Sequence, residues 1–285
     1  MASVTSNAMG PQGPIGVFDS GLGGLSVLRH IRSCLPGEDL LYFADSGYAP
    51  YGGRSDEEIV VRSLAIAAFL MQQGARALVV ACNTATAAAI KALRAHYPAL
   101  PLVGVEPGLK PGAALTKSGT VGVLATKSTL ASEKFRLLRE QVTAITGVRF
   151  ETQACIGLAD QVEKGELHSP ATAILVRRYV EPLIECGADT LVLGCTHYPF
   201  VQPLIEEAVN RMTSKPITIV DTGEPVARQL VRLLGEHRKN TELPGTVSGF
   251  TTASASGLRN AFAGLLGMEV PVTKMTGERI VQDAA

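Results

Sequence analysis

The sequence lacks the features of several classes of protein. Its 285 residues carry 26 basic and 26 acidic side chains, so the formal net charge is zero. This balance argues against a nucleic-acid partner and favours small molecules as ligands. No apolar run approaches the roughly 18 residues that cross a membrane, so we expect no membrane association.

The N-terminal segment MASVTSNAMGPQGP lacks the basic and apolar regions of a secretory signal. Ser6-Asn7-Ala8 before Met9 resembles the remnant of an expression tag. We therefore expect residues 1–13 to be a tag or disordered leader outside the fold, and we expect a soluble, cytoplasmic chain.

Cysteine pairs with the spacing of redox or zinc sites are also missing. The five cysteines are odd in number, and no two of them form a CxxC pair, so we expect no disulfide framework. Cys195-Thr196-His197 lacks the spacing of a structural zinc site, which argues against a metal. Segment 19–24 is not GxGxxG, and no GxxxxGKS/T occurs, so nucleotide binding is not expected.

The chain does have a regular alternation of short apolar runs and helical patterns, with 46% apolar residues. The expected helices are 57–73, opened by a capping box of Ser55 and Glu58, 84–96, 132–143, 171–186 and 199–212. The expected strands are 15–18, 40–44, 77–81, 102–105, 121–124, 149–152, 190–194, 217–220 and 247–250. This alternation predicts parallel α/β sheets covered on both faces.

Three pairs of segments recur in the same order. Segment 74–82, GARALVVAC, aligns with 187–195, GADTLVLGC. The other pairs are 16–20 with 122–126 and 103–106 with 219–222. One such pair could arise by chance, but three in order indicate an internal repeat. We therefore predict two pseudo-symmetric parallel-sheet α/β domains, with the active site in the cleft between them.

Cys82 and Cys195 end equivalent strands of this repeat. In open α/β sheets, ligands bind beyond the carboxyl ends of the strands. A helix N-terminus there is expected to lower the pKa of a thiol, and a modest shift from about 8.5 makes the thiol a base at neutral pH. Asn83, Thr84 and Thr196 follow and can hydrogen-bond a carboxylate or ammonium. The alternative is that Cys82 and Cys195 are a pair of buried structural cysteines. We expect the other three, Cys34, Cys155 and Cys186, to serve only in packing.

Two matched thiols suit an inversion at a stereocentre. One thiolate removes a proton from one face, and the other thiol delivers a proton to the opposite face; the roles swap in the reverse reaction. Three further groups have open roles. Asp19 either contacts a cation or a thiol proton, or caps a helix. His197 either tunes the thiol of Cys195, contacts the substrate, or forms a hydrogen bond to the backbone. The turn 49–53 either closes over a ligand or is only a turn.

Together these motifs resemble the bacterial glutamate racemases of the aspartate/glutamate racemase family. The resemblance runs from about residue 15 to residue 272. The motifs that carry it are GVFDSGLGG (16–24), YFADS (42–46), PYG (50–52), ACNT (81–84), GVEP (104–107) and LGCTHYP (193–199).

The resemblance implies interconversion of L- and D-glutamate without a cofactor, which supplies D-glutamate for peptidoglycan. It implies that Cys82 handles the proton of D-glutamate and Cys195 that of L-glutamate. It also implies that Asp19 and His197 assist them, with Glu163 as a further carboxylate near the site. The implied substrate contacts are Asp19, Ser20, Tyr51, Gly52, Asn83, Thr84, Thr196 and His197.

The family architecture implies a discontinuous first domain, residues 14–107 with 222–285, and a second domain of residues 108–221. Homodimers are common in the family, although no interface is legible in the sequence. The alternatives are a racemase of aspartate or another amino acid, a single-thiol decarboxylase or isomerase, and a non-catalytic protein. The last would be an amino-acid sensor, or would act on a partner such as DNA gyrase. The presence of both Cys82 and Cys195 argues against the single-thiol enzyme.

Overall fold

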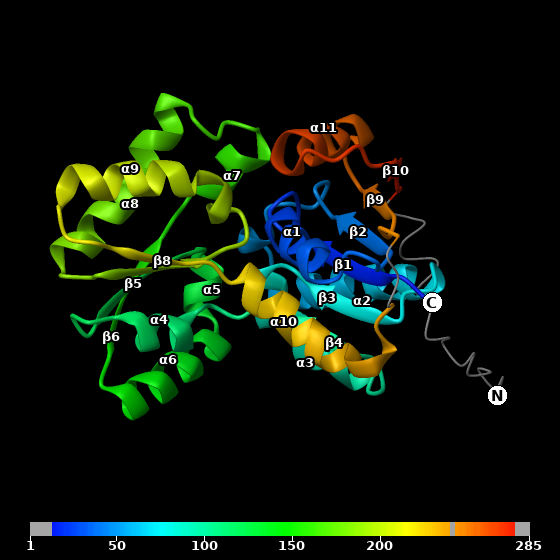
Figure 1. Ribbon diagram of the computed structural model, residues 1–285, viewed down its shortest axis with the longest axis horizontal. Coiled ribbons are helices and arrows are strands. Elements are labelled where there is room, and N and C mark those ends of the chain that lie inside the picture. Colours follow the sequence, from blue (N-terminus) through cyan, green and yellow to red (C-terminus); the bar gives the residue numbers. More distant parts are fainter. Residues whose placement is uncertain (1–12, 240–242, 277–285) are drawn as a thin grey trace.

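The computed structural model describes residues 13–239 and 243–276, which form two α/β lobes (Figure 1). Residues 1–12 of the expected leader lie outside the described residues. Gly13 lies inside them, and its carbonyl oxygen accepts a hydrogen bond of 2.7 Å from Nε of Arg76. Among the described residues, no helix combines the length and the apolar character that a membrane span requires.

Each lobe contains one parallel sheet. The first sheet has the order β10-β9-β2-β1-β3-β4, and the second has the order β6-β5-β7-β8. The four strands β2-β1-β3-β4 therefore recur as β6-β5-β7-β8, which confirms the internal repeat and makes β3 and β7 equivalent. The strands are β1 (Ile15–Asp19), β2 (Leu40–Ala44), β3 (Ala77–Val80), β4 (Leu102–Gly104), β5 (Thr120–Ala125), β6 (Arg149–Ala154), β7 (Thr190–Gly194), β8 (Thr218–Val220), β9 (Val247–Thr251) and β10 (Val272–Lys274).

Helices cover both faces of each sheet, as expected for parallel strands that are apolar on both sides. Val17 of β1 packs in a cluster with α1 and α10, whereas the next residue, Phe18, packs in a cluster with α2 and α3. The α-helices are α1 (Leu25–Cys34), α2 (Asp56–Gln72), α3 (Asn83–His96), α4 (Leu109–Leu115), α5 (Lys127–Ala131), α6 (Glu133–Thr146), α7 (Leu158–Glu163), α8 (Pro170–Glu185), α9 (Gln202–Met212), α10 (Gly223–Leu234) and α11 (Ala255–Leu266). The 3₁₀-helices of the described residues are η1 (Tyr51–Gly53), η2 (Tyr198–Val201) and η3 (Gly235–His237).

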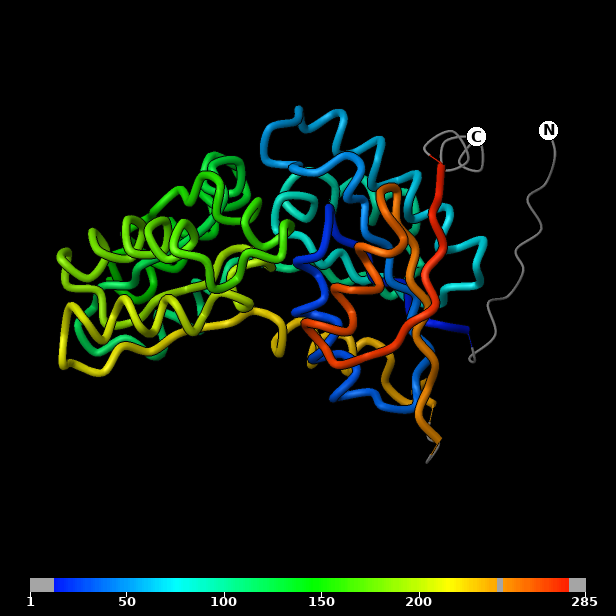
Figure 2. Tube along the Cα trace, turned by 90° about the horizontal axis from the view of Figure 1, so that it is seen from above, coloured from blue at the N-terminus to red at the C-terminus, as the bar shows by residue number. Residues whose placement is uncertain are grey.

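The chain leaves the first sheet after β4, builds the whole second sheet, and returns through α10, which packs on α1. Figure 2 shows the same course, with the green and yellow middle of the chain in one lobe and both blue and orange segments in the other. On this basis we propose the domain limits 14–107 with 222–285, and 108–221.

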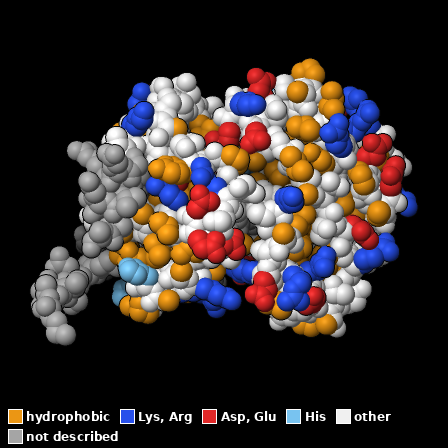
Figure 3. Space-filling model, turned by 180° about the vertical axis from the view of Figure 1, so that it is seen from behind, with side chains coloured by type: hydrophobic (Ala, Val, Ile, Leu, Met, Phe, Trp, Pro, Cys, Tyr) orange, Lys and Arg blue, Asp and Glu red, His pale blue; other side chains and the backbone are white. Residues whose placement is uncertain are grey.

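Several local expectations are confirmed and others are wrong. The capping box is present: Ser55 Oγ accepts from the Glu58 N–H at 3.2 Å, and the Ser55 N–H donates to Glu58 at 3.0 Å. The helix expected at 199–212 is divided into η2 and α9. Cys155 is buried, but Cys34 and Cys186 are exposed, so the packing role assigned to those two is wrong. On the face in Figure 3, basic and acidic side chains are interspersed.

Candidate active site

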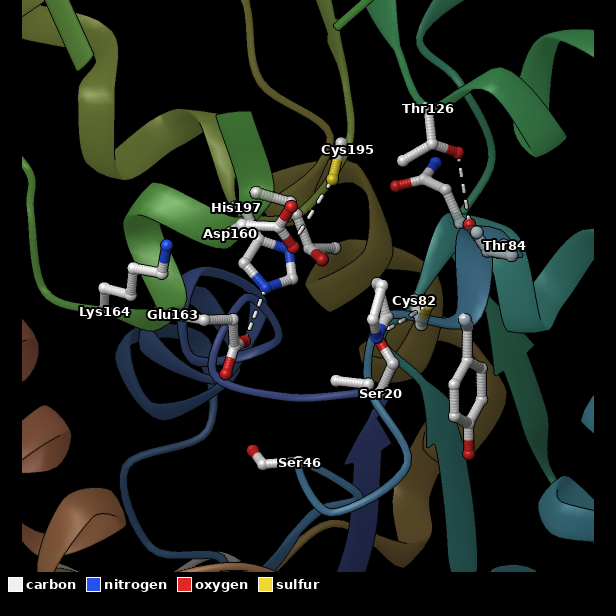
Figure 4. A pocket seen from close by; sticks show the side chains of 17 residues that line it. Ser20, Ser46, Cys82, Thr84, Thr126, Asp160, Glu163, Lys164, Cys195 and His197 are labelled. Carbon is white, nitrogen blue, oxygen red and sulfur yellow. Dashed lines mark hydrogen bonds and ion pairs between the residues drawn. The ribbon is translucent and has the colours of Figure 1, made fainter. Parts of the chain in front are cut away.

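A pocket of about 350 Å³ lies where the strand ends of the two domains meet. Figure 4 shows Cys82 and Cys195 approaching it on elements of different domains. Its walls are formed by Ser20, Ser46, Ala49, Pro50, Tyr51, Gly52, Cys82, Asn83 and Thr84 of the first domain, and by Thr126, Ala159, Asp160, Glu163, Lys164, Cys195, Thr196 and His197 of the second. The pocket therefore brings together every site residue expected from the sequence except Asp19.

Cys82 follows β3 and is the N-cap residue of α3. Its sulfur accepts from the N–H of Ala85 at 3.4 Å and donates to Ser20 Oγ at 3.5 Å. Burial raises the pKa of this thiol, and the negative charge of Asp19 raises it further, which outweighs both hydrogen bonds. The expected lowering of the thiol pKa at a helix N-terminus is therefore wrong for Cys82, because desolvation of a buried thiolate costs more than one N–H group returns.

Cys195 follows β7 and begins a chain of three polar groups. Its sulfur lies 3.5 Å from Nδ1 of His197, and Nε2 of His197 lies 2.7 Å from Oε1 of Glu163. Burial lowers the pKa of His197, but the hydrogen bonds and negative charges of Cys195 and Glu163 outweigh burial and raise it well above its usual value. The structure thus favours an imidazolium that is oriented by Glu163 and donates to the sulfur of Cys195.

Glu163 lies on α7 and has an environment that keeps it ionised. Burial raises the pKa of its carboxyl group, but the hydrogen bond and charge of His197 and the N–H of Leu22 outweigh burial and lower it. The Leu22 N–H donates to Oε1 at 2.5 Å from the glycine-rich loop of the first domain. Glu163 therefore joins the two domains beside the pocket.

The glycines of this loop permit that close approach. A Cβ on Gly21 would lie 2.1 Å from Oε1 of Glu163, and a Cβ on Gly23 would lie 2.4 Å from Nδ1 of His197. One N–H group of this loop, that of Leu22, donates to the carboxylate of Glu163. Here glycine is required by contact between the domains.

Asp19, the last residue of β1, is fully buried behind the pocket wall. Its carboxylate accepts from the N–H of Ser20 at 2.7 Å, from the N–H of Gly24, and from Oγ1 of Thr196 at 3.4 Å. Burial raises its pKa, although the charge of His197 opposes this. Asp19 therefore contacts Ser20 of the first domain and Thr196 of the second, and a side-chain hydrogen bond with Cys82 also opposes the rise of its pKa.

Asn83 and Thr84 begin α3 at the pocket wall. Both polar atoms of the Asn83 carboxamide are buried and have no hydrogen-bond partner among the described residues. Buried polar groups nearly always have partners, so this amide is suited to a ligand. Oγ1 of Thr84 lies 3.2 Å from Oγ1 of Thr126, which connects the wall of one domain to that of the other.

Tyr51 and Gly52 lie in η1, in the loop between β2 and α2. The Tyr51 hydroxyl donates to Oδ2 of Asp45 at 2.6 Å, so its proton is not offered to the pocket. Burial and the charge of Asp45 raise the pKa of the phenol, which keeps it protonated. Tyr51 thus forms a wall of the pocket with its hydroxyl directed to Asp45, and closure of the turn 49–53 over a ligand stays a prediction.

Sequence reasoning missed Ser46, Thr126, Ala159, Asp160 and Lys164 as pocket residues. Thr126 could have been predicted from the sequence, because the repeat aligns it with Ser20. Asp160 and Lys164 carry no comparable signal, since they line the pocket only through the placement of α7.

Among residues 13–239 and 243–276, no group of three His, Cys, Asp or Glu side chains is arranged to hold a metal ion.

Comparisons with known proteins identify relatives of this chain. The model of the Asp/Glu/hydantoin racemase family matches residues 15–230. The glutamate racemase of Ectopseudomonas mendocina is 56% identical over 79% of this chain and 84% of its own length. That of Methylococcus capsulatus is 57% identical over 79% and 80%.

Solved structures agree with these relatives. Glutamate racemase RacE1 from Bacillus anthracis has a TM-score of 0.83 at 32% identity, and the match covers 94% of this chain and 99% of that one. The Escherichia coli enzyme in complex with L-glutamate and the activator UDP-MurNAc-ala has a TM-score of 0.77 at 30% identity, over 92% and 98%. The chain therefore belongs to the Asp/Glu/hydantoin racemase family and, within it, to the glutamate racemases.

Proposed function

We propose that this chain interconverts L- and D-glutamate by a two-base mechanism in which Cys82 and Cys195 exchange protons with the α-carbon, without a cofactor. One observation carries the proposal: cysteines at the ends of the equivalent strands β3 and β7 line the same pocket from different domains. Glutamate as the substrate is supported by the Escherichia coli relative bound to L-glutamate and by the Francisella tularensis relative bound to D-glutamate.

The proposed reaction starts from a Cys195 thiolate and a Cys82 thiol. Cys195 takes the α-proton of L-glutamate, and Cys82 gives its proton to the opposite face of the resulting carbanion, which yields D-glutamate. The sulfur of Cys195 is then protonated and that of Cys82 is ionised, so the reverse reaction starts from D-glutamate. The raised pKa of Cys82 suits its role as proton donor in the first direction.

The surrounding groups support this chemistry. His197, held by Glu163, can stabilise negative charge on the sulfur of Cys195 through Nδ1–H. We propose that the unpaired carboxamide of Asn83, with Ser20, Thr84 and Thr196, holds the carboxylate and ammonium groups of the substrate. Asp19 then acts on the site through Ser20 and Thr196.

In the cell, we propose that the product D-glutamate enters peptidoglycan synthesis in the cytoplasm, as the membership of the glutamate racemases suggests. This role would link the enzyme to cell-wall formation and cell shape.

Serine substitution tests the two thiols. Because a serine hydroxyl is a far weaker acid than a thiol and is not ionised near neutral pH, Cys82→Ser and Cys195→Ser are each expected to abolish racemisation measured by circular dichroism of glutamate. The exposed Cys34 provides a matched control, and Cys34→Ser should leave the rate unchanged. Near-normal turnover by a folded Cys82→Ser or Cys195→Ser variant would contradict the two-thiol mechanism.

A further inference from the structure

A buried ion pair lies next to the pocket but outside the proposed catalytic groups. Arg62 of α2 binds Asp45 with both ends of its guanidinium group, Nε to Oδ2 at 3.0 Å and Nη2 to Oδ1 at 2.6 Å. The side chain of Arg62 is 8% exposed and that of Asp45 is fully buried. Burying such a pair is costly, so its presence calls for an account.

The carboxylate of Asp45 is saturated with donors. Besides Arg62, it accepts from the Tyr51 hydroxyl at 2.6 Å and from Oγ1 of Thr252 at 2.9 Å, so each oxygen receives two hydrogen bonds. An ionised carboxylate offers about four lone-pair positions, and all are used here. Removing the fork of Arg62 would therefore leave a buried charge with half of its partners.

The same guanidinium group also contacts the middle of the loop that connects β2 to α2. Its Cζ atom lies 3.6 Å from the centre of the Tyr48 ring, which is a stacking contact. Asp45 begins this loop and Tyr51 lies near its end, so Arg62 reaches the loop directly at two points and at a third through Asp45. The residues of this loop that line the pocket are Ser46, Ala49, Pro50, Tyr51 and Gly52.

We propose that Arg62 is a positioning residue for substrate binding, which fixes the 46–52 wall of the pocket through Asp45 and Tyr51. The inference rests on the proposed racemase function and adds a residue to it. Arg62 does not touch the pocket, and its effect is on the affinity for glutamate. A lysine at this position would keep the charge but lose both the two-point contact and the stacking on Tyr48.

The chain offers a matched control. Arg76 and Glu38 form a second buried pair, Nη2 to Oε1 at 2.6 Å with side chains 6% and 1% exposed. This pair lies at the opposite end of the first sheet, where Arg76 also binds Gly13 just before β1. Arg62→Lys and Arg76→Lys therefore make the same chemical change in two similarly buried ion pairs. The pair of Arg62 lies near the pocket, and the pair of Arg76 lies far from it.

The test measures kcat and KM of racemisation and the melting temperature for both variants. Because the loop contributes binding rather than proton transfer, Arg62→Lys is expected to raise KM for both enantiomers about tenfold while kcat changes less than about threefold. Arg76→Lys is expected to lose comparable thermal stability with KM unchanged. A folded Arg62→Lys variant with the KM of the wild type would overturn the proposal, as would equal changes of KM in both variants.

Tyr51→Phe provides a second route, because Arg62 is argued to act through the Tyr51 hydroxyl. This variant should raise KM on its own, and adding Arg62→Lys to it should raise KM by less than the product of the two single effects. If Arg62→Lys does not fold, an unchanged KM in Tyr51→Phe still overturns the proposal. Failure of the racemase function itself would appear separately, as absence of racemisation by the wild-type protein.

Discussion

Replacing Gly23 by alanine tests the claim that the glycine-rich loop exists to let His197 approach. The new Cβ would lie 2.4 Å from Nδ1 of His197 and 2.7 Å from Oγ1 of Thr196. Ordinary contact begins at 3.4 Å, so His197 or the loop must move by roughly 1 Å. His197 is buried and bound at both ring nitrogens, and such a shift must weaken its contact with Cys195 or Glu163.

The expected cost falls mainly on catalysis. Displacing a catalytic group by about 1 Å can reduce the rate about 100-fold, whereas overpacking costs about 1–3 kcal/mol of stability. Gly23→Ala should therefore lower kcat/KM about 100-fold and leave a folded protein. Because the two enantiomers have equal free energies in water, kcat/KM must fall by the same factor in both directions.

The assay follows racemisation by circular dichroism from L-glutamate and, separately, from D-glutamate. Gly264 in α11 provides the control, because a Cβ there meets nothing within 4 Å. Gly264→Ala should keep full activity and gain about 0.5–1 kcal/mol of stability. A Gly23→Ala variant that keeps kcat/KM within about threefold of the wild type would refute the packing argument.

Two other changes separate function from stability. Asn83→Leu removes two buried polar atoms that have no hydrogen-bond partner in the described part of the chain, so it should raise KM for glutamate about tenfold or more without lowering the melting temperature. A clear loss of stability would show that the amide has a structural partner. Asp189 accepts hydrogen bonds from Thr116 and from the N–H groups of Lys117 and Ser118; burial raises its pKa, but these bonds outweigh it and lower the pKa from 3.8 to about 2. The ionised Asp189 carboxylate thus stabilises the fold above its unfolded pKa, and this effect is lost as the pH falls through about 2. Asp189→Asn should therefore lower the free energy of unfolding at neutral pH by at most about 2 kcal/mol, and by less after solvent screening. In urea unfolding near pH 2, the variant and the wild type should differ little.

The sequence was sufficient for the fold because its signals are local. The bounds of β2 and β7 are those expected, and Ser55 and Glu58 form the expected cap, since apolar runs and caps depend on a few neighbouring residues. The strand β10 was missed because its three residues are too short to form a pattern and are mostly exposed.

The repeat located the site at strand ends, whereas the roles of Tyr51, Gly52 and Glu163 were implied by the family resemblance. The repeat located Cys82 and Cys195 because equivalent strands end at equivalent positions. The contact of Glu163 with Leu22 joins residues 141 positions apart and depends on how the two domains pack, which local patterns do not encode. The raised pKa of Cys82 likewise follows from burial and from Asp19, neither of which a helix N-terminus reveals.

Racemisation of L-glutamate in D₂O, followed by proton NMR during the first turnovers, tests most directly whether two separate groups exchange the α-proton. With two bases, the thiol that donates to the product has already equilibrated with solvent. New D-glutamate should then carry deuterium at the α-carbon, while the remaining L-glutamate keeps its proton. Product that retains the original α-proton, or L-glutamate that exchanges before it is inverted, would contradict the two-base account.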